Sequence, residues 1–440
     1  MQFNTSFSLE ATMKCRILTF LTVAAFLAAL ALPTPCLAQK PNHKLPHYTV
    51  LDLGTLGGSY SFAEDNAPNQ TGQVDGFSTL PGDAVVHAFL WSNGGMIDLG
   101  TLGGPNSEAI WQLNDWGGVP GVSDTTTPDP NGEDYCSFGT YLICRAFVWY
   151  QGLRITLPTL GGNNTYGAQI NNWGQMAGAS EIDLPDPSCT NPQALTERPV
   201  IWEQGRVREL PILPSDSVGS AFVINNRGQA AGVSAPDCYN STWHAVLWKN
   251  RAPIYLGTLG GQLLNIPQAI NNQTQVVGGS DLLGDTVQHA FLWENGAMTD
   301  LGKTPLPGYP NSIAEGINDK GQVVGVASEQ PWYGGNSSAF LWQDGVMTDL
   351  NTLIPPGSPL FLWWATGINS RGQIAGQAVV VSTGEWHAFL ATPVENESDA
   401  AFASGETRER PKVTLPDNVR KLLQRRARFG GFKGGLVVPQ

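Results

Sequence analysis

Apolar and polar residues alternate along this chain in short blocks that recur seven times between Ala63 and Gly376. Each block contains an apolar run, an Asn-rich turn, Gly-Gln or an equivalent pair, and a second apolar run that ends in glycine. The clearest copies are at 269–272, Gly316–Gly325 and Gly367–Gly376, and weaker copies centre on Gly72, Gly117, Gly174 and Gly228. Repeats of roughly 20 to 50 residues are typical of arrays of one supersecondary unit, so the pattern predicts a repeat fold.

The repeat from Gly257 to Leu301 shows the expected elements most clearly. Short strands are predicted at Pro267–Asn271, Gln275–Ser280, His289–Trp293 and Ala297–Leu301. An Asn-Asn turn, a polar loop and an Asn-Gly turn connect these strands in series. Four strands in roughly 45 to 57 residues is the length of one β-propeller blade.

The composition of the turns supports this prediction. An Asn followed three residues later by Gly, as in Asn171–Gly174, Asn318–Gly321 and Asn369–Gly372, suits a type I turn followed by a residue of positive φ. Glycine adopts positive φ without steric cost. The pairs Asn295-Gly296 and Asp344-Gly345 match tight hairpin turns. We therefore interpret these residues as turn formers and not as ligand-binding groups.

The two ends of the repeat region complement each other. His387–Leu390 is a third strand with no fourth strand after it, and Tyr48–Gly54 is a fourth strand with no third strand before it. Pairing them would complete a seventh blade and remove two open edges. We therefore predict an all-β fold, a seven-bladed β-propeller of four-stranded antiparallel blades, closed by pairing of the N-terminal strand with the last blade.

A His-Ala-Phe motif recurs in the predicted third strands, between Asp-Leu-Gly-Thr-Leu-Gly-Gly and Ile-Asn-x-x-Gly-Gln segments. Its copies are His87–Trp91, His289–Trp293 and His387–Leu390. This combination resembles the HAF repeat family of probable extracellular bacterial proteins. The resemblance covers nearly the whole region from 48 to 393 and implies secretion and a repeat fold, without an established activity. Because Arg145, Arg198 and Ser338 replace the His in other repeats, an essential catalytic role for this His is in doubt.

Composition and charge agree with an extracellular all-β domain. The chain has 51 Gly, 31 Pro and only 14% charged residues, which is typical of many short strands joined by turns. Between Gln39 and Thr392 there are 13 Lys and Arg and 30 Asp and Glu, a net charge of −17. This negative field disfavours nucleic acid and anionic lipid as partners.

The N-terminal region predicts export. Lys14 and Arg16 precede an apolar stretch, Ile17–Leu32, and small residues follow at Cys36–Ala38. The stretch is shorter than the roughly 20 residues that cross a bilayer, so we expect a cleaved signal peptide and no transmembrane anchor. The expected regions are a signal peptide at 1–38, a linker at 39–47, the propeller at 48–393 and a mostly disordered basic tail at 394–440. We expect a monomer that is secreted or periplasmic, or held at the cell envelope.

Four cysteines remain after the signal peptide. They are Cys136, Cys144, Cys189 and Cys238. In an oxidising compartment an even number predicts disulfides. Three connectivities are possible, and we favour Cys136 with Cys144, in one insertion, and Cys189 with Cys238, in equivalent insertions of neighbouring repeats. Without a C-x-x-C pair, and with few His, we expect no metal site.

The long insertions all lie between the second and third strands of a repeat, so they should emerge on one face of the ring, here called the loop face. Loops on a rigid scaffold are the usual seat of recognition. The candidate binding residues on this face are Tyr135, Tyr141, Tyr239, Trp243, Trp332, Tyr333 and Trp386. Aromatic rings among carboxylates suit carbohydrate or a cationic ligand. The alternative is that the aromatic residues only hold the long loops in place.

Signatures of catalysis are missing: there is no G-x-S-x-G, no H-E-x-x-H and no phosphate-binding loop. We therefore predict a noncatalytic recognition or cell-surface module for carbohydrate, protein or another extracellular ligand. The alternative is a propeller enzyme of the glycoside hydrolase or polysaccharide lyase type, with paired carboxylates in the channel.

Two weaker signals concern metal ions. The segment Asp281–Asp285 could ligate calcium, although it lacks the spaced acids of a dedicated loop, and we expect no other cofactor. The recurring histidines lie at equivalent positions around the ring and would not converge on one ion. They are His87, His244, His289 and His387. We expect each of them to donate a hydrogen bond to a neighbouring backbone carbonyl instead.

Overall fold

The computed structural model describes residues 45–63, 67–189, 193–238, 242–331 and 334–394. The chain divides into two units, Met1–Lys44 and Leu45–Gln440, and all described residues belong to the second unit. The expected signal peptide and the tail from residue 395 lie outside the described residues. Within the described ranges, no helix is long and apolar enough to span a membrane.

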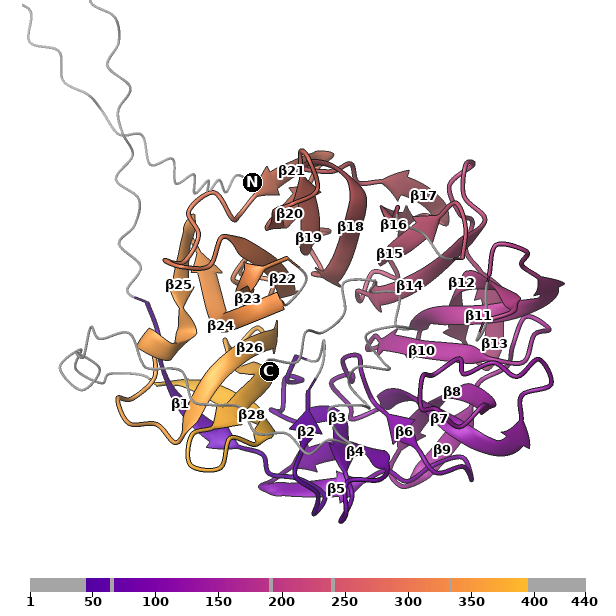
Figure 1. The fold of residues 1–440 in the computed structure, drawn as a ribbon, viewed down its shortest axis with the longest axis horizontal. Helices are drawn as coiled ribbons and strands as arrows, with labels where there is room; N and C mark the ends of the chain where they lie inside the picture. The colour runs from indigo at the N-terminus through magenta and orange to yellow at the C-terminus, as the bar shows by residue number, and fades with distance from the viewer. Residues whose placement is uncertain (1–44, 64–66, 190–192, 239–241, 332–333, 395–440) are drawn as a thin grey trace, which may run out of the picture. The chain divides into compact units, whose positions relative to one another are not determined.

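The described residues form seven four-stranded antiparallel sheets, arranged as the blades of a β-propeller (Figure 1). From the inner to the outer strand, blade 1 contains β2 (Ser61–Phe62), β3 (Val74–Thr79), β4 (Val86–Ser92) and β5 (Gly95–Asp98). Blade 2 contains β6 (Ser107–Glu108), β7 (Val119–Pro128), β8 (Leu142–Tyr150) and β9 (Leu153–Thr156). Blade 3 contains β10 (Thr165–Ile170), β11 (Met176–Pro185), β12 (Leu195–Glu203) and β13 (Arg206–Glu209).

The same order holds around the rest of the ring. Blade 4 contains β14 (Val218–Ile224), β15 (Ala230–Ala235), β16 (His244–Lys249) and β17 (Ala252–Tyr255). Blade 5 contains β18 (Gly260–Ile270), β19 (Val276–Leu282), β20 (Gln288–Glu294) and β21 (Ala297–Asp300). Blade 6 contains β22 (Asn311–Ile317), β23 (Val323–Gln330), β24 (Gly334–Gln343) and β25 (Val346–Asp349), followed by a short 3₁₀ turn, η1 (Leu350–Thr352). Blade 7 contains β26 (Leu360–Ile368), β27 (Ile374–Val380), β28 (Trp386–Val394) and β1 (His47–Asp52).

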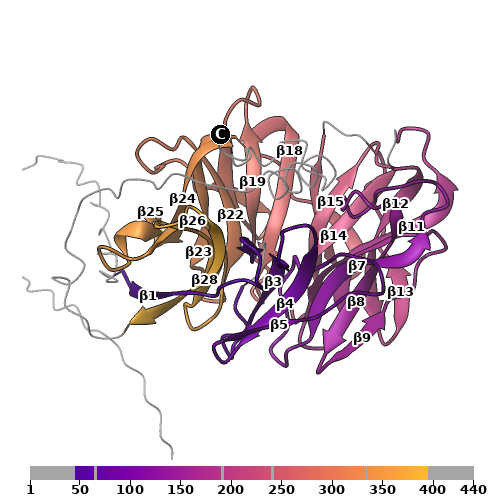
Figure 2. The same cartoon turned by 60° about the horizontal axis from the view of Figure 1, so that its bottom comes forward.

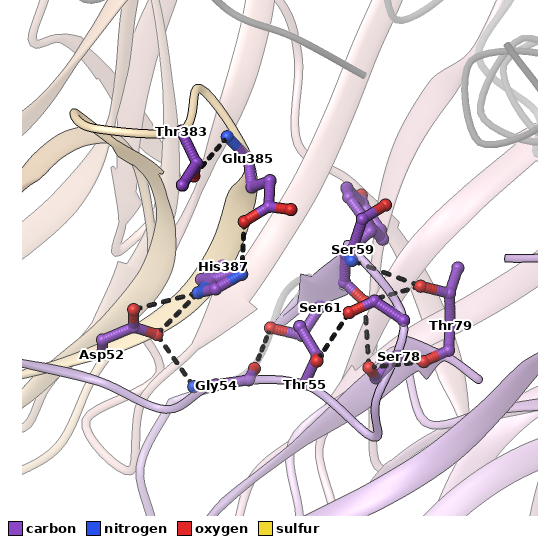
Figure 3. Close-up of polar contacts among 12 residues, drawn as sticks. Asp52, Gly54, Thr55, Ser59, Ser61, Ser78, Thr79, Thr383, Glu385 and His387 are labelled. Atoms are coloured by element: carbon purple, nitrogen blue, oxygen red, sulfur yellow. Dashed lines mark hydrogen bonds and ion pairs between the residues drawn. The ribbon is translucent and has the colours of Figure 1, made fainter. Parts of the chain in front are cut away.

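Blade 7 closes the ring as the sequence predicts. Strand β1 pairs antiparallel with β28, with Asp52 opposite Phe389. The Asp52 carboxylate also lies 2.9 Å from Nδ1 of His387 and accepts the Gly54 N–H at 2.8 Å (Figure 3). Burial opposes ionisation of Asp52, but the hydrogen bonds from His387 and Gly54 hold its pKa below the ordinary value. These bonds fix the outermost strand of the ring to its neighbour.

The His-Ala-Phe motif joins each blade to the next one. Phe291 is completely buried, which contributes about 2 to 3 kcal/mol of burial energy at each such position. The Ala290 N–H donates to Ser312 Oγ of blade 6 at 3.0 Å, and the Ala388 N–H donates to Ser61 Oγ of blade 1 at 2.9 Å. The motif therefore stabilises the stacking of neighbouring sheets.

The motif histidines bind carboxylates, so the expected bond to a backbone carbonyl is wrong. In each pair, Nδ1 lies 2.9 Å from an Asp oxygen, and the pairs are His87–Asp98, His244–Asp216, His289–Asp300 and His387–Asp52. In blade 6, Ser338 Oγ donates to Asp349 at 2.9 Å, and in blade 3 Arg198 pairs with Glu209 at 3.3 Å. His, Arg and Ser replace one another in these blades because each can donate to a nearby acid, which lies on the adjacent strand in every pair except His244–Asp216.

The turns have the predicted geometry. The Gly321 N–H donates to Asn318 O at 3.0 Å, and Gly321 has φ of 75°. Asn295 and Gly296 have φ of 52° and 86°, as a two-residue hairpin turn requires. Blade 5 differs because Thr274, with φ of 69°, occupies the position that Gly321 has in blade 6. A β-branched residue in this conformation is strained.

Both predicted disulfides are present. Cys136 is bonded to Cys144 within the insertion of blade 2, and Cys189 is bonded to Cys238. The second bond joins the insertion that follows β11 in blade 3 to the insertion that follows β15 in blade 4. The loop face is therefore covalently linked across neighbouring blades.

Candidate functional site

A cavity of about 130 Å³ is formed by one segment from each of the seven blades. Each segment is the end of an inner strand together with the Asn turn that follows it. These turns connect first and second strands, so they lie on the face opposite to the long insertions, here called the turn face. Figure 2 shows the blades more from the side, with their strands running between the two faces. We call this cavity the cup.

Seven buried Asn side chains hold the turns around the cup together. They are Asn69, Asn114, Asn171, Asn225, Asn271, Asn318 and Asn369. Each Nδ2 donates to the backbone carbonyl of the corresponding Asn in the next blade at 2.9 to 3.2 Å, and Asn369 completes the circle by donating to Asn69. Each side chain also stabilises its own turn; for example, Asn318 Oδ1 accepts the Lys320 and Gln322 N–H groups. The sequence predicts the turn role but not the bonds between blades.

Polar side chains, mostly amides, line the wall and the rim of the cup. Those on or shortly after the inner strands are Gln112, Gln169, Gln268, Glu315 and Thr366, and those on the turns include Asp115, Asn172, Asn226, Asn272 and Asp319. Gln169 Nε2 donates to Gln112 Oε1 at 2.8 Å. None of the described residues that line the cup is Lys, Arg or His. An amide both donates and accepts hydrogen bonds, so this wall suits a ligand that does the same.

The rim is ordered by bonds between blades before any ligand binds. The Asp115 carboxylate accepts the Gln70 N–H at 2.9 Å and Asn172 Nδ2 at 2.6 Å. The Asp319 carboxylate accepts the N–H and the Nδ2 of Asn272, at 2.8 and 3.0 Å. A rim that is already ordered loses little conformational entropy when a ligand binds.

Apolar side chains fill the ring beside the cup. One buried cluster, with the side chains packed against it, takes residues from all seven blades. Phe62 of blade 1 packs edge-on against Trp364 of blade 7, with ring centres 5.4 Å apart. Trp111 of blade 2 and Phe222 of blade 4 stack at 5.4 Å although blade 3 separates their sheets. Among the described residues, the interior of the ring is therefore largely a packed apolar core.

The predicted aromatic residues of the loop face do not form one exposed surface. Trp386 is fully buried against Trp363, with ring centres 4.5 Å apart, so its predicted exposure is wrong. It instead packs where β28 borders the central cluster. Tyr135 and Trp243 are partly buried against the same cluster. Tyr141 is 52% exposed. The remaining candidates, Tyr239, Trp332 and Tyr333, lie outside the described residues.

A group of buried acids lies among the insertions of blades 2 and 3. Asn164 Nδ2 is 2.9 Å from Asp129, 3.5 Å from Glu133 and 3.1 Å from Glu181. Burial, together with repulsion from Glu133, raises the pKa of Glu181 well above its usual range. Burial raises the pKa of Glu197 to about 7, despite a hydrogen bond from the Tyr135 hydroxyl. Glu181 and Glu197 therefore retain protons at pH values where exposed carboxyls are ionised.

The segment that could ligate calcium is held by backbone amides. Asp285 accepts the Gln262 N–H at 2.7 Å, and Asp281 accepts the Leu264 N–H at 3.0 Å. One trio of candidate ligand residues occurs among the described residues, Asp186, Cys189 and Cys238. Its two cysteines are joined as a disulfide, so they present no thiolate to a metal.

Two residues at the cup were not among the sequence-based site candidates. Trp116 and Trp173 occupy the third position of the Asn turns of blades 2 and 3, and both are exposed on the turn face. The sequence signal was available: a large aromatic residue stands at the same turn position in two successive repeats, where an exposed turn is normally polar.

Comparisons with known proteins give only distant structural similarities. No protein-family model matches the chain, and no curated protein sequence matches it. Similar solved structures include a Mycobacterium tuberculosis puromycin-hydrolyzing peptidase, 14% identical with a TM-score of 0.43, over 78% of this chain and 56% of that one. The acylaminoacyl peptidase of Pyrococcus horikoshii is 10% identical with a TM-score of 0.44, over 77% of this chain and 53% of that one.

A gluconolactonase from Xanthomonas campestris is also similar, at 9% identity and a TM-score of 0.35, over 79% of this chain and 91% of that one. The chain spans about half the length of the two peptidases. Similarity at this level does not identify an activity. The class that the fold defines is that of the β-propeller proteins.

Proposed function

We propose that this protein is an exported, noncatalytic recognition module that binds an uncharged, hydroxyl-rich extracellular ligand in the cup. The observation that carries the proposal is the cup itself, a polar cavity built from all seven blades and lined mainly by amides. Hydroxyl groups donate and accept hydrogen bonds, as amides do, and the ordered rim provides fixed positions for them.

The charges around the cup favour a neutral ligand. Among the described residues, three acids belong to its wall and rim, Asp115, Glu315 and Asp319. Three bases stand at the next turn position, exposed on the same face, and they are Arg227, Lys320 and Arg371. The negative charges of the acids and the positive charges of the bases offset each other, so the electrostatic potential favours neither a cationic nor an anionic ligand.

The geometry of the cup does not favour the alternative function, that of a hydrolase with paired carboxylates in the channel. Such an enzyme needs two acids that face the bound substrate from opposite sides. At the cup, Glu315 is almost completely buried, and Asp115 and Asp319 accept hydrogen bonds from rim residues of neighbouring blades. The carboxylates of Asp115 and Asp319 therefore act as structural acceptors.

Export and the HAF repeat resemblance form part of the same proposal. The two disulfides support an oxidising compartment. The expected signal peptide would direct the chain there. The packing of the His-Ala-Phe motif between blades supplies a physical reason for its recurrence in a repeat family.

The test combines a binding assay with a hydrolysis assay. Residues 39–440 are screened on an array of neutral, acidic and basic glycans, and the strongest binders are titrated by calorimetry. We expect binding without release of reducing sugar, and weaker binding by Gln112→Ala and Asn226→Ala in the cup. Asn336→Ala, on the loop face, is the matched control. Release of reducing sugar, or the absence of binding to every glycan, would contradict the proposal.

A further inference from the structure

The third position of each Asn turn is exposed and lies immediately beside the rim of the cup. Its occupants, from blade 1 to blade 7, are Thr71, Trp116, Trp173, Arg227, Gln273, Lys320 and Arg371. Most of these side chains are polar, as expected for an exposed turn. Trp116 is 44% exposed and Trp173 is 76% exposed. Two adjacent blades therefore present large apolar rings to solvent beside a polar cavity.

Hydrogen bonds between blades hold both indoles at the rim. Trp116 Nε1 donates to the backbone carbonyl of Asn172 at 3.2 Å, and Trp173 Nε1 donates to that of Asn226 at 2.9 Å. Asn172 and Asn226 are themselves residues of the cup. Trp116 also packs edge-on against Tyr150, with ring centres 5.1 Å apart. Each ring is therefore fixed across the junction to the next blade.

The fold does not need an aromatic ring to make this bond. In blade 5, the Gln273 side chain donates to the backbone carbonyl of Asp319, the equivalent acceptor. A polar side chain thus satisfies the same carbonyl without exposing an indole to water. Exposed apolar surface that the fold does not require marks an interaction site. The bond to the carbonyl therefore explains the Nε1 groups of Trp116 and Trp173 but not their aromatic rings.

We infer that the ligand of the cup is an oligosaccharide whose sugar rings stack on Trp116 and Trp173, an inference that rests on the proposed function. The apolar face of a pyranose presents weakly positive C–H groups, which pack favourably on the negative face of an indole. The hydroxyl groups at the edge of the sugar can then bond to the amides of the cup. Because the two rings belong to neighbouring blades, the ligand is a chain of sugars and not a single sugar.

A cationic ligand would also be attracted to an indole face, but the positive charge nearest Trp173 opposes it. Arg227 occupies the turn position that follows Trp173 around the ring, and it is exposed. Its charge disfavours a second cation beside Trp173. A neutral sugar avoids this repulsion.

The experiment measures binding of cellohexaose, chitohexaose, xylohexaose, maltohexaose and choline to residues 39–440 by calorimetry. We expect at least one hexasaccharide to bind and choline not to bind. Trp173→Gln retains the bond to the rim, as Gln273 does, and removes the ring, so affinity should fall about tenfold or more. Trp173→Phe retains an aromatic face and should retain most of the affinity. Removing both rings, in Trp116→Gln with Trp173→Gln, should abolish measurable binding.

Two controls separate this inference from the proposed function. Tyr141→Ala removes an exposed ring from the loop face and should leave affinity unchanged, and an unchanged melting temperature verifies that each variant folds. If the double Trp variant binds as the parent does while Asn226→Ala weakens binding, the stacking inference fails and the cup proposal stands. Loss of binding in Tyr141→Ala, or tighter binding of choline than of any hexasaccharide, also overturns the inference. If no probe binds, both proposals fail.

Discussion

The two faces of this propeller are held together by different means. On the turn face, one arrangement is repeated seven times, and each buried Asn bonds to the next blade. On the loop face, different interactions hold the different insertions. They are disulfides in blades 2 to 4, buried acids around Asn164, and aromatic packing at Trp386. The cup lies on this regular face. Because the turns are so similar in the seven blades, the aromatic residues Trp116 and Trp173, at the third turn position of two neighbouring blades, are clear exceptions to the repeat.

The largest expected effect concerns the covalent links of the loop face. The Cys189–Cys238 bond closes a chain separation of 49 residues and the Cys136–Cys144 bond a separation of 8. Because a longer closed loop restricts the unfolded chain more, changing the first pair to Ala should cost about 4 kcal/mol and the second about 2.5 kcal/mol. Guanidinium unfolding followed by circular dichroism measures both. Equal losses of unfolding free energy in the two variants would show that the length of the closed loop does not determine how much each disulfide stabilises the protein.

The next effect tests the hydrogen-bonded turn face. Asn318→Ala removes four hydrogen bonds, two through Nδ2 and two through Oδ1. At about 1 kcal/mol for each buried bond, we expect a loss of about 3 to 4 kcal/mol in the free energy of unfolding. Asn336→Ala, an exposed Asn of the loop face, should cost less than about 0.5 kcal/mol in the same assay. A loss below about 1 kcal/mol for Asn318→Ala would mean that the Asn ring contributes little.

The third prediction concerns pH, to which the loop face should be more sensitive. The folded state holds protons on Glu181 and Glu197 that the unfolded chain releases near pH 4.5. The resulting stabilisation is complete below about pH 4.5 and is lost as pH rises through about 7 for Glu197 and about 8 for Glu181. We expect the free energy of unfolding to fall by about 2 kcal/mol between pH 5 and pH 8.

Glu181→Gln provides the control for this dependence, because the amide cannot ionise. Its unfolding free energy should vary less between pH 5 and pH 8 than that of the parent. Arg145 is the nearby cation that moderates the effect. An unchanged pH slope in Glu181→Gln would remove Glu181 from the explanation.

The smallest expected effect is a gain on the turn face. Thr274 has φ of 69°, a conformation that costs a β-branched residue more than glycine. Thr274→Gly should stabilise the protein by about 0.5 to 1 kcal/mol through relief of backbone strain. The loss of the hydrogen bond from Thr274 Oγ1 to Gln229 offsets part of this gain. The reverse change, Gly321→Thr, should destabilise it by about 1 kcal/mol or more. Thermal unfolding distinguishes the two, and a loss of stability in Thr274→Gly would contradict this account.

Much of the fold could be predicted from the sequence because its determinants are local and repeated. The Asn and Gly of each turn lie three residues apart, and the unpaired strands at Tyr48 and His387 indicate closure. The His–Asp pairs could also have been found, since His87 and Asp98, like His289 and Asp300, are separated by 11 residues. The bonds of the Asn ring could not, because six of the partners lie 45 to 57 residues away, the seventh lies 300 residues away, and all are of one type.

The site was less predictable than the fold for a physical reason. Aromatic residues in insertions can either pack inward or face solvent, and the sequence does not separate these outcomes. Trp386 packs inward, whereas Trp173, in a turn of only four residues, has no interior to enter and remains exposed. The acids around Asn164 come from segments without a repeat, so their proximity required the structure.

The shared blade 7 also constrains how this protein can be synthesised and folded. Strand β1 emerges early, yet its partner β28 is made more than three hundred residues later, since Asp52 lies opposite Phe389. Until then, the blades that have already formed present unsatisfied apolar faces at both ends of an incomplete circle. A nascent chain in this state is prone to aggregation, which favours a chaperone-bound, unfolded intermediate until synthesis is complete. For the same reason, a variant truncated before Trp386 should not yield a smaller working ring.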